Sequence, residues 1–441
     1  MDEQKARPHI RKPPTPTASR RLDDGTLVEL IFDPVRRATA FAVWRDGQWK
    51  VETEVVDSGE LLVPYSPGNN LIKNRVILLP SEPAEYGSKA ELVSDIRHFL
   101  HRYIDLSPSF EVAVAYYVLF TWLYDAFGEL PYLRFQGDFG TGKSRALLIA
   151  GSVCYKAFFA SGASTVSPLF HILDAFGGTL ILDEADFRFS DEKAEVVKLL
   201  NNGNVDGMPI LRTMINRQHE FNPQAFRVYG PKMVGMRKAY DDQALESRFL
   251  TEVMGQSDLR SDIPINLPPA WKQEAQDLRN KLLLYRFHHR HQVALDDATR
   301  VSSLAPRGNQ VLVPLLSIVD DAAARHAITE FAVAAQDGAA VDRGLSSEAQ
   351  VLEIIRELSG EAHNDAVPIL EIAQRFSARF GDEYQRPISP RWIGTILRQR
   401  LHLTPYKSNG RFLLPISDGS RMQLLYSKHG ILPIEEALPG Q

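Results

Sequence analysis

The pattern of apolar and polar residues changes in character along the chain. From residue 25 to about residue 80 it consists of short alternating runs such as LVELIF, ATAFAVW and WKVETEVV, which predict half-buried strands. The last of these runs is RVILLP at residues 75–80. Asp46 and Gly47 lie between two runs and predict a tight hairpin. Trp44 and Trp49 flank it and are expected to pack in the core or across the strands, with a stacking platform as the alternative. We therefore expect a small β module at residues 22–87.

Helical spacing replaces alternation after residue 88. Residues 89–104 and 109–127 predict two helices, the second so apolar that it should be buried. Further on, PYLRFQG and TLILDEAD predict core strands, and helical patterns lie between them. Strands that alternate with helices predict a parallel sheet covered by helices.

The later part of the chain contains a hairpin, a helical region and a final mixed unit. MPILRTMIN and QAFRVYG predict two β elements around a polar tip, and PKMVGM predicts another core strand. Residues 264–335 are expected to form a helical lid, and the Gly- and Asp-rich residues 337–347 a linker. Three helical patterns followed by RFLLPI and RMQLLYS as β elements favour a winged helix at residues 348–441.

Composition narrows the class of protein. The chain has 441 residues, of which 44% are hydrophobic and 24% charged, as in soluble proteins of two or three domains. Its 50 basic residues against 55 acidic ones give no hint of nucleic acid, so any basic surface must be local. The one cysteine, Cys154, excludes an internal disulfide framework and is expected to be a buried thiol.

The N-terminal segment and the absence of long apolar runs bear on location. Residues 1–21 carry six basic side chains, two acidic ones and four prolines, which predicts a disordered basic tail. No stretch has the apolar length of a signal peptide or a spanning helix. A cytoplasmic protein without membrane contact is expected.

The strongest chemical signal is the sequence GDFGTGKS at residues 137–144. Phosphate binding needs converging backbone N–H groups, a flexible loop and a helix start that favours an anion, and this loop joins a predicted strand to a predicted helix. Lys143 is expected to reach the β and γ phosphates of ATP, and the Ser144 hydroxyl to ligate Mg²⁺. The predicted nucleotide-binding residues are Gly137, Asp138, Phe139, Gly140, Thr141, Gly142, Lys143 and Ser144.

A second signal lies at the end of the apolar run Leu180 to Leu182, where Asp183 and Glu184 follow. The first carboxylate is expected to hold the metal, and Glu184 to polarise the attacking water. A strand that ends in ordinary surface acids is the alternative. Because the second acid is present, hydrolysis is favoured over nucleotide binding alone.

At this point the sequence resembles the AAA+ superfamily. ALESRF resembles the ALxSRF box of minichromosome maintenance-type helicases, which implies that Arg248 is an arginine finger acting in a neighbouring subunit. PRGNQVLVPLLSIVDD resembles phage and mobile-element helicases and implies that Arg307 is sensor 2, with Arg279 and Arg286 as rivals. At the strand end where such proteins usually have a polar sensor 1, this chain has Arg237 after an apolar Gly-Met pair, which departs from the pattern. The resemblance covers about residues 90–330.

Two regions are candidates for DNA contact. The predicted hairpin resembles the channel hairpin of hexameric helicases, with Arg217 and His219 at its tip, although an ordinary exposed hairpin remains open. From residue 386 to residue 428 there are eight Lys or Arg residues and one acid. The candidate DNA contacts there are Arg391, Arg398, Arg400, Lys407 and Arg411. A winged helix that serves as a protein contact is the alternative.

The sequence therefore predicts an α/β protein with an AAA+ P-loop core at residues 88–263, a helical lid, an N-terminal β module and a C-terminal winged helix. We expect a ring, most simply a hexamer, that uses ATP and Mg²⁺ to move along or unwind DNA in a phage or mobile-element replication system. The alternative hypotheses are a helicase loader or transposition-type ATPase, and a nucleotide-switched DNA-binding regulator.

Overall fold

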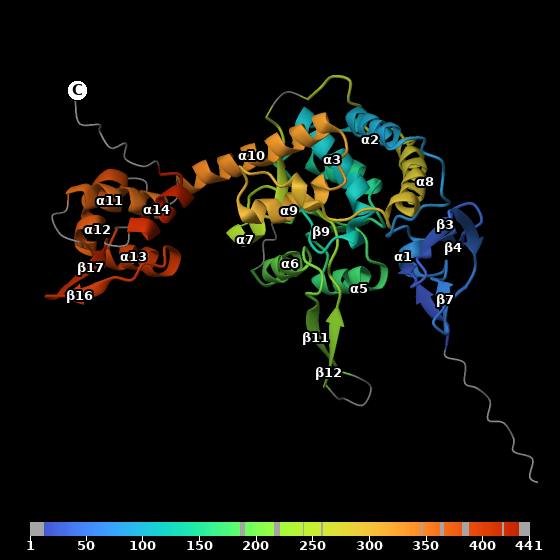
Figure 1. Cartoon of the computed structure of the whole chain (residues 1–441), viewed down its shortest axis with the longest axis horizontal. Coiled ribbons are helices and arrows are strands. Elements are labelled where there is room, and N and C mark those ends of the chain that lie inside the picture. The colour runs from blue at the N-terminus through green and yellow to red at the C-terminus, as the bar shows by residue number, and fades with distance from the viewer. Residues whose placement is uncertain are drawn as a thin grey trace, which may run out of the picture. The chain divides into compact units, whose positions relative to one another are not determined.

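The computed structural model defines a mixed α/β chain (Figure 1). It describes residues 13–185, 190–215, 221–240, 242–256, 259–344, 347–361, 366–381, 388–416 and 419–431. The chain divides into two compact units, Met1–Ala332 and Val333–Gln441, which are taken in turn below. No helix within the described ranges is long and apolar enough to cross a bilayer.

The first unit begins with a module of short strands. Its strands are β1 (Thr15–Thr17), β2 (Ser19–Arg21), β3 (Leu27–Asp33), β4 (Ala38–Arg45), β5 (Gln48–Glu52), β6 (Val55–Asp57) and β7 (Glu60–Pro64). They form an antiparallel sheet in the order β2-β3-β4-β5 and a smaller sheet in the order β1-β7-β6. The hairpin prediction is confirmed, because Asp46 and Gly47 both have positive φ and Trp44 pairs with Trp49.

Two predictions for this region were wrong. The disordered tail was expected to reach residue 21, but β1 pairs with β7 and β2 with β3, so residues 15–21 are ordered. Existing strand edges supply the backbone hydrogen bonds that a polar segment cannot make alone. Residues 75–80 are not a strand: α1 (Asn70–Lys73) precedes them, and Ile77 makes only an isolated bridge to Phe158. Their alternation reflects burial of Ile77 and Leu79 against the core.

A parallel sheet forms the centre of the first unit. Its elements are α2 (Lys89–Tyr103), α3 (Pro108–Thr121), β8 (Tyr132–Gln136), α4 (Lys143–Ser152), β9 (Phe158–Ser161), α5 (Val166–Phe176), β10 (Leu180–Asp183), α6 (Ser190–Asn202), β11 (Ile210–Ile215), β12 (Phe221–Phe226), β13 (Lys232–Met236), α7 (Gln243–Glu246) and β14 (Phe249–Val253). The order β14-β8-β13-β10-β9 is parallel throughout. Most of α3 is fully buried, as its apolar composition predicts.

The edge strand β14 has no counterpart among the sequence predictions. Phe249–Val253 pairs with Tyr132–Gln136 along its whole length. The run is short and begins three residues after Glu246, the end of the helical ALE, so neither its length nor its pattern separates it from a helix end. The antiparallel hairpin β11–β12 is confirmed by its register and projects from the core (Figure 1).

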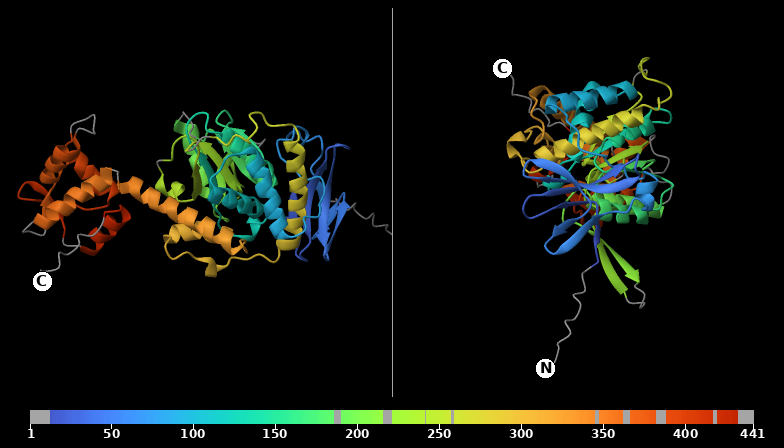
Figure 2. Two further views of the ribbon diagram at one scale, coloured as in Figure 1. Left: turned by 90° about the horizontal axis from the view of Figure 1, so that it is seen from above. Right: turned by 90° about the vertical axis from the view of Figure 1, so that its right-hand side faces the viewer.

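Three further helices follow: α8 (Trp271–His289), α9 (Pro306–Leu316) and α10 (Ala322–Gly344), the last of which begins in the first unit and ends in the second. Figure 2 shows α8 between the N-terminal strands and the core. Trp44 stacks on Phe287 of α8 with ring centroids 5.6 Å apart, so this tryptophan packs rather than offering a free surface. The helix α10 continues through residues 337–344, which composition had suggested to be a linker; the surrounding alanines have high helix propensity and offset Gly338.

The second unit has its own core. Its elements are α11 (Ser347–Glu361), β15 (Ala366–Pro368), α12 (Ile369–Phe380), α13 (Pro390–Thr395), the π-helical turn η4 (Ile396–Arg400), β16 (Tyr406–Ser408), β17 (Arg411–Pro415) and α14 (Gly419–Lys428). Leu352, Phe376 and Leu397 are among its fully or almost fully buried residues. The run RMQLLYS is helical in α14 and not a strand, which corrects the prediction. Met422 and Leu425, three residues apart, both pack on this core.

Candidate functional site

The Gly-rich loop lies between the carboxyl end of β8 and the start of α4. Gly140 and Gly142 have φ of 80° and 90°, which favour glycine, and Gly142 is the N-cap of α4. At Gly137 a Cβ atom would lie 2.7 Å from Thr141 Oγ1 and 3.0 Å from the Met254 carbonyl oxygen. The backbone path of the loop thus depends on glycine at these three positions, and it leads to a helix N-terminus with unpaired N–H groups.

Side chains of the loop divide into internal contacts and exposed groups. Lys143 Nζ donates to the Asp138 carbonyl oxygen at 2.5 Å, and Thr141 Oγ1 donates to the same oxygen at 3.0 Å. The Asp138 carboxylate accepts from the Phe139 N–H at 2.7 Å. Ser144 is exposed, and 87% of the Phe139 surface is accessible. The lysine ammonium therefore already lies over the loop, and the next residue, Ser144, is accessible from solvent.

Asp183 is the last residue of β10 and Glu184 follows it, at the edge of the sheet where the strands end and the Gly-rich loop begins, called the carboxyl edge below. The strand β13 separates β10 from β8, and its Gly235 pairs with Phe135 of β8. A Cβ atom at Gly235 would lie 2.9 Å from Asp183 Oδ1 and 2.7 Å from Leu147 of α4. Glycine in the intervening strand thus leaves room for the aspartate beside the first turns of α4.

Glu184 has an unusual backbone conformation. Its φ is 55°, a left-handed value that costs free energy for a residue with a side chain. Its N–H donates to Asp183 Oδ1 at 2.9 Å, and the side chain is exposed. Strain of this kind is common where a side chain must point in a functional direction, and here it falls on the predicted catalytic glutamate.

Arg248 lies at the opposite end of the strands, where they begin, called the amino edge below. Its carbonyl oxygen accepts from the N–H of Tyr132, the first residue of β8, whereas the loop follows the last residue of that strand. The two ends of a five-residue strand are about 13 Å apart. Arg248 is 9% exposed, and its guanidinium donates to the backbone and side-chain oxygens of Asn201 at 2.9 and 2.5 Å. The structure therefore does not bring Arg248 to the loop of its own chain.

Arg307 lies near Arg248 and not beside the Gly-rich loop. Burial lowers the pKa of the Arg248 guanidinium, and the positive charge of Arg307 lowers it further. Arg307 contacts Gln310, which donates to Glu129 at 2.6 Å. Asn204 is completely buried, and neither polar atom of its side chain has a hydrogen-bond partner. Two like charges and unpaired buried polar groups thus gather at the amino edge of the sheet.

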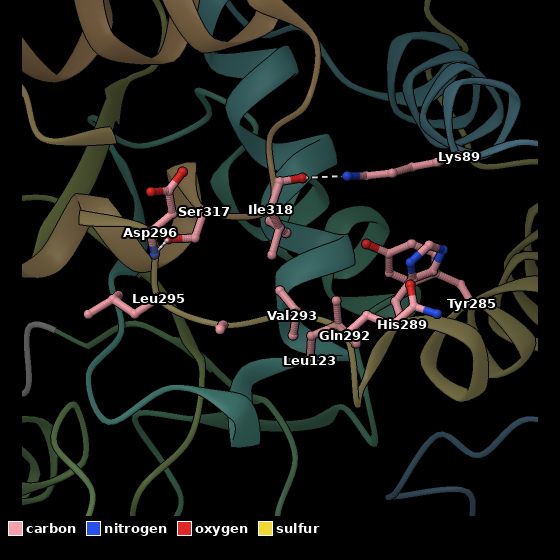
Figure 3. A pocket seen from close by; sticks show the side chains of 11 residues that line it. Lys89, Leu123, Tyr285, His289, Gln292, Val293, Leu295, Asp296, Ser317 and Ile318 are labelled. Carbon is pink, nitrogen blue, oxygen red and sulfur yellow. Dashed lines mark hydrogen bonds between the residues drawn. The ribbon is translucent and has the colours of Figure 1, made fainter. Parts of the chain in front are cut away.

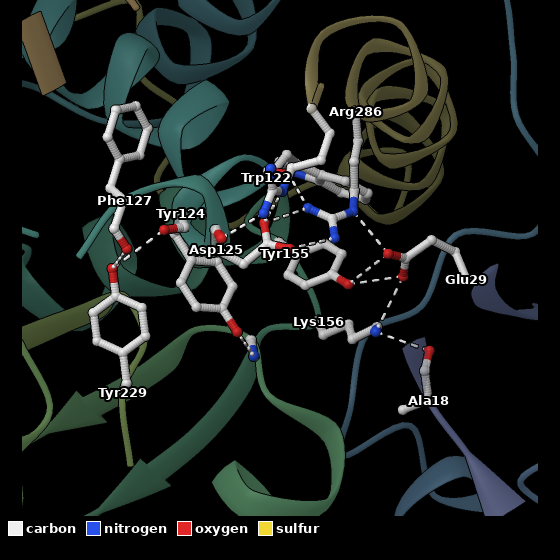
Figure 4. Close-up of polar contacts among 12 residues, drawn as sticks. Ala18, Glu29, Trp122, Tyr124, Asp125, Phe127, Tyr155, Lys156, Tyr229 and Arg286 are labelled. Carbon is white, nitrogen blue, oxygen red and sulfur yellow. Dashed lines mark hydrogen bonds and ion pairs between the residues drawn. The ribbon is translucent and has the colours of Figure 1, made fainter. Parts of the chain in front are cut away.

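Arg279 and Arg286, the rivals of Arg307, are buried in structural contacts. Arg279 donates to the Ser152 carbonyl oxygen at 2.5 Å. Arg286 bridges Glu29 of β3 and Asp125, at 2.7 and 2.8 Å, as Figure 4 shows. Both arginines therefore join elements of the first unit, and neither is free for a nucleotide.

A buried polar network surrounds Arg286, and no sequence pattern predicted it. Glu29 accepts from Tyr155 Oη at 2.7 Å and pairs with Lys156 Nζ at 3.1 Å (Figure 4). Burial lowers the pKa of Lys156 to about 8, against the opposing effect of Glu29. Burial raises the pKa of Asp125, but the Arg286 charge outweighs it and holds that pKa well below its usual range. The network connects the β module to the core through Glu29, Lys156 and Arg286, whose side chains are at most 4% exposed.

The predicted DNA contacts differ in how they are placed. Arg217 and His219 lie outside the described residues. Arg391, Arg398, Lys407 and Arg411 are exposed in the second unit. Arg400 instead pairs with Glu348 of α11 at 2.7 Å, so the glutamate partly neutralises its charge. In the first unit, Arg237 follows β13 and is also exposed.

Two surface pockets lie away from the Gly-rich loop. The first, of about 410 Å³, is lined by residues of α2, α8 and the loops around α9 (Figure 3). Its Lys89 ammonium donates to the Ile318 carbonyl oxygen at 2.5 Å and pairs with Asp320 at 3.2 Å. This ammonium therefore already has partners within the chain. The second, of about 290 Å³, lies beside the network of Figure 4 and includes Arg20, Arg227 and Tyr229.

Comparison with known proteins gives distant structural likeness only. No protein-family profile matches the chain, and no curated protein matches it. The C-terminal region of NrS-1 is similar at a TM-score of 0.39 and 13% identity, over 88% of this chain and 96% of that one. The Aeropyrum pernix ORC1 protein in complex with DNA gives 0.23 and 14%, over 76% and 97%. Drosophila ORC bound to DNA gives 0.19 and 13%, over 79% and 96%. Scores this low carry no argument about function.

Proposed function

We propose that the chain is an AAA+ ATPase that works on DNA as a ring-forming translocase or helicase. The observation that carries the proposal is the meeting of the Gly-rich loop, Asp183 and the strained Glu184 at one edge of a parallel sheet. Ligands of parallel α/β sheets bind at the carboxyl ends of the strands, where these groups lie.

The residues present fit a nucleotide and a divalent cation. The first N–H groups of α4 and the Lys143 ammonium would hold the phosphates, and the Ser144 hydroxyl and Asp183 would hold Mg²⁺. Magnesium binds few protein ligands and keeps several waters, so one hydroxyl and one carboxylate are enough. Bound there, the ion would neutralise charge that develops on the transferred phosphoryl group.

Glu184 would orient and deprotonate the water that attacks the terminal phosphate. Its exposed carboxylate follows Asp183 directly, so the metal ligand and the base differ by one residue in the chain. The backbone at Glu184 is left-handed, so the extended path of β10 ends before this residue. That arrangement supports hydrolysis over nucleotide binding alone.

Arg248 and Arg307 would act in the site of a neighbouring copy. Both lie at the amino edge of the sheet, away from the loop of their own chain. A guanidinium that reaches phosphate must therefore come from another protomer, which is the reason for proposing a ring and, by resemblance, a hexamer. To reach out, Arg248 would have to leave Asn201.

DNA is the proposed polymer because the exposed cations of the second unit lie in a segment with almost no acids. A winged helix is the proposed identity of that unit, since helices α11 to α13 accompany a small sheet in the order β15-β17-β16. A phage or mobile-element replication system is the proposed setting, on the resemblance alone.

Hydrolysis of ATP by the purified chain with Mg²⁺ tests the proposal. We expect Lys143→Ala to abolish nucleotide binding, because the phosphates lose their main cation. Glu184→Gln should retain binding while turnover falls by about 10²- to 10⁴-fold, the usual contribution of general base catalysis. Lys50→Ala, which changes an exposed lysine of β5, is the matched control and should behave as the unaltered chain does. Unaltered turnover in Glu184→Gln would remove this glutamate from the mechanism.

A forked DNA duplex separates the proposal from its alternatives. Strand separation that is lost in Glu184→Gln supports a helicase. Hydrolysis stimulated by DNA without strand separation supports a loader or transposition-type ATPase. Binding to one DNA sequence with negligible turnover supports a nucleotide-switched regulator.

A further inference from the structure

The hairpin of β16 and β17 is held in one register. Asn409 and Gly410 form its two-residue turn with φ of 47° and 78°, the left-handed pair that matches strand twist. The pairs Tyr406 with Leu413, Lys407 with Phe412 and Ser408 with Arg411 follow from it. The third strand, β15, pairs only with residues 413–415, so the tip of the hairpin extends beyond the three-stranded part.

This hairpin exposes two aromatic side chains. Tyr406 is 45% exposed and Phe412 is 51% exposed, whereas Leu414 of the same strand is completely buried. Side chains alternate between the faces of a strand, and Phe412 pairs with Lys407 while Tyr406 pairs with Leu413. One aromatic ring therefore lies on each face of the hairpin. An exposed ring costs free energy in water, so two on one short hairpin indicate a binding surface.

The charges around the two rings have one sign. Residues 388–416 contain five Lys or Arg residues and no Asp or Glu. Lys407 Nζ lies 5.9 Å from the centroid of the Phe412 ring, and Arg411 is exposed next to it in sequence. Cations interleaved with exposed rings are the composition that nucleic-acid strands select, since phosphates need the charge and bases need the ring faces.

We propose that Phe412 and Tyr406 stack on unpaired bases of a single DNA strand, while Lys407 and Arg411 contact its phosphates. The inference rests on the proposed action on DNA and adds the form of DNA that the second unit binds. Bases inside a duplex are already stacked and offer only their edges, which hydrogen-bonding side chains read. Ring faces are useful only where bases are unstacked, so this hairpin suits single strands or the open arm of a fork.

Binding of the full chain to fluorescent 30-nucleotide oligothymidine and to a duplex of equal length tests the inference. We expect Phe412→Ala and Tyr406→Ala each to weaken single-strand binding by about 5- to 100-fold, the usual range for one lost stacking contact. Duplex binding should change far less. Phe412→Trp, which keeps a stacking face, should bind the single strand at least as well as the unaltered chain.

The salt dependence of binding distinguishes stacking from charge. Lys407→Ala should lower the slope of log affinity against log salt by about 0.7, the value for one phosphate contact on a single strand. Phe412→Ala should leave that slope unchanged, because it removes no charge. Leu424→Ala is the matched control, since Leu424 is 70% exposed on α14 in the same unit but outside the hairpin. Phe412→Leu is a second variant that keeps apolar volume, and it should weaken binding as Phe412→Ala does.

Several outcomes would overturn the inference. Single-strand binding as tight as that of the unaltered chain in both Ala variants would exclude stacking. Equal losses on single strand and duplex would show that the rings do not select unpaired bases. A change in sedimentation mass with unchanged DNA affinity would make the hairpin a protein contact. If the unaltered chain binds neither DNA, the proposed action on DNA fails together with this inference.

Discussion

The two edges of the central sheet use charged residues in opposite ways. At the carboxyl edge, Glu184 has a left-handed backbone and an exposed side chain, and Lys143, the first residue of α4, is partly exposed. At the amino edge, Lys232 is completely buried and donates to the carbonyl oxygens of Gly203, Val228 and Gly230 at 2.8 to 3.1 Å. The carboxyl edge thus leaves charged groups accessible to a ligand, whereas at the amino edge Lys232 is fully paired within the chain.

Burial and the number of internal partners distinguish charged groups that stabilise the fold from those that a ligand can reach. Lys232 is buried and donates to three carbonyl oxygens, so its ammonium is not available to a ligand. Burial lowers the pKa of Lys232 well below its usual range. An exposed lysine with one partner in a Gly-rich loop can exchange that partner for phosphate. Arg248 and Arg307 are the exception, since they lie at the amino edge yet are proposed to act in a neighbouring copy.

The largest expected effect concerns this exception. We expect Arg248→Ala to lower ATP turnover by about 10³-fold or more, the range seen when an arginine that contacts the transferred phosphoryl group is removed. Because the arginine and the lysine would serve different protomers, mixing Arg248→Ala with Lys143→Ala protein should restore part of the activity. Steady-state hydrolysis across mixing ratios measures this.

A control separates catalysis by Arg248 from its internal contacts. Asn201→Ala removes the side-chain partner of Arg248 at the amino edge and leaves the guanidinium in place. It should retain most turnover if Arg248 acts on a neighbour. Full turnover in Arg248→Ala, with none in Lys143→Ala, would end the shared-site proposal and make Arg248 a structural residue like Lys232.

The next effect tests the comparison directly with two lysines. Lys232→Met should lower the free energy of unfolding by at least ~3 kcal/mol, because three buried carbonyl oxygens lose their donor. Lys143→Met should leave it within about 0.5 kcal/mol, as for most exposed positions. Urea unfolding followed by far-ultraviolet circular dichroism gives both values. Similar losses in the two variants would mean that the edges do not differ as described.

The sequence predicted the fold best where the local pattern and the tertiary contacts agree. The strand, loop and helix around residues 137–144 and the Asp46-Gly47 hairpin are fixed by backbone requirements of particular residues. The strand β14 and the helix α14 were missed or wrong, because five to ten residues of mixed pattern fit either state until their packing partners are known.

For the candidate site, the sequence identified the residues of the carboxyl edge but not the position of those at the amino edge. A motif fixes spacing along the chain, so Lys143 and Ser144 could be placed from their loop. The closeness of Arg248 to Arg307 depends on how α9 packs, and no local pattern encodes that. The network of Glu29, Lys156 and Arg286 joins three distant segments and was likewise invisible.

The smallest expected effect concerns Lys156, which precedes β9 at the amino edge. It tests whether this lysine is shielded from water in the folded chain. A free lysine has a pKa of about 10.4, whereas burial lowers that of Lys156 to about 8 in the folded chain. Between these values the unfolded chain binds more protons than the folded chain does. The contribution of Lys156 to stability should therefore rise with pH across that window.

Unfolding free energies of the unaltered chain and of Lys156→Met between pH 7.5 and pH 9.5 measure this contribution. The unaltered chain should gain on the order of 1–2 kcal/mol relative to the variant, because the variant has no proton to release. Effects of other titrating groups, such as the Cys154 thiol, are common to both proteins and cancel in the difference. Lys50→Met, which alters an exposed lysine, should follow the unaltered chain. A difference that stays constant with pH would show that Lys156 is as well solvated as an exposed lysine, and that the amino edge admits water.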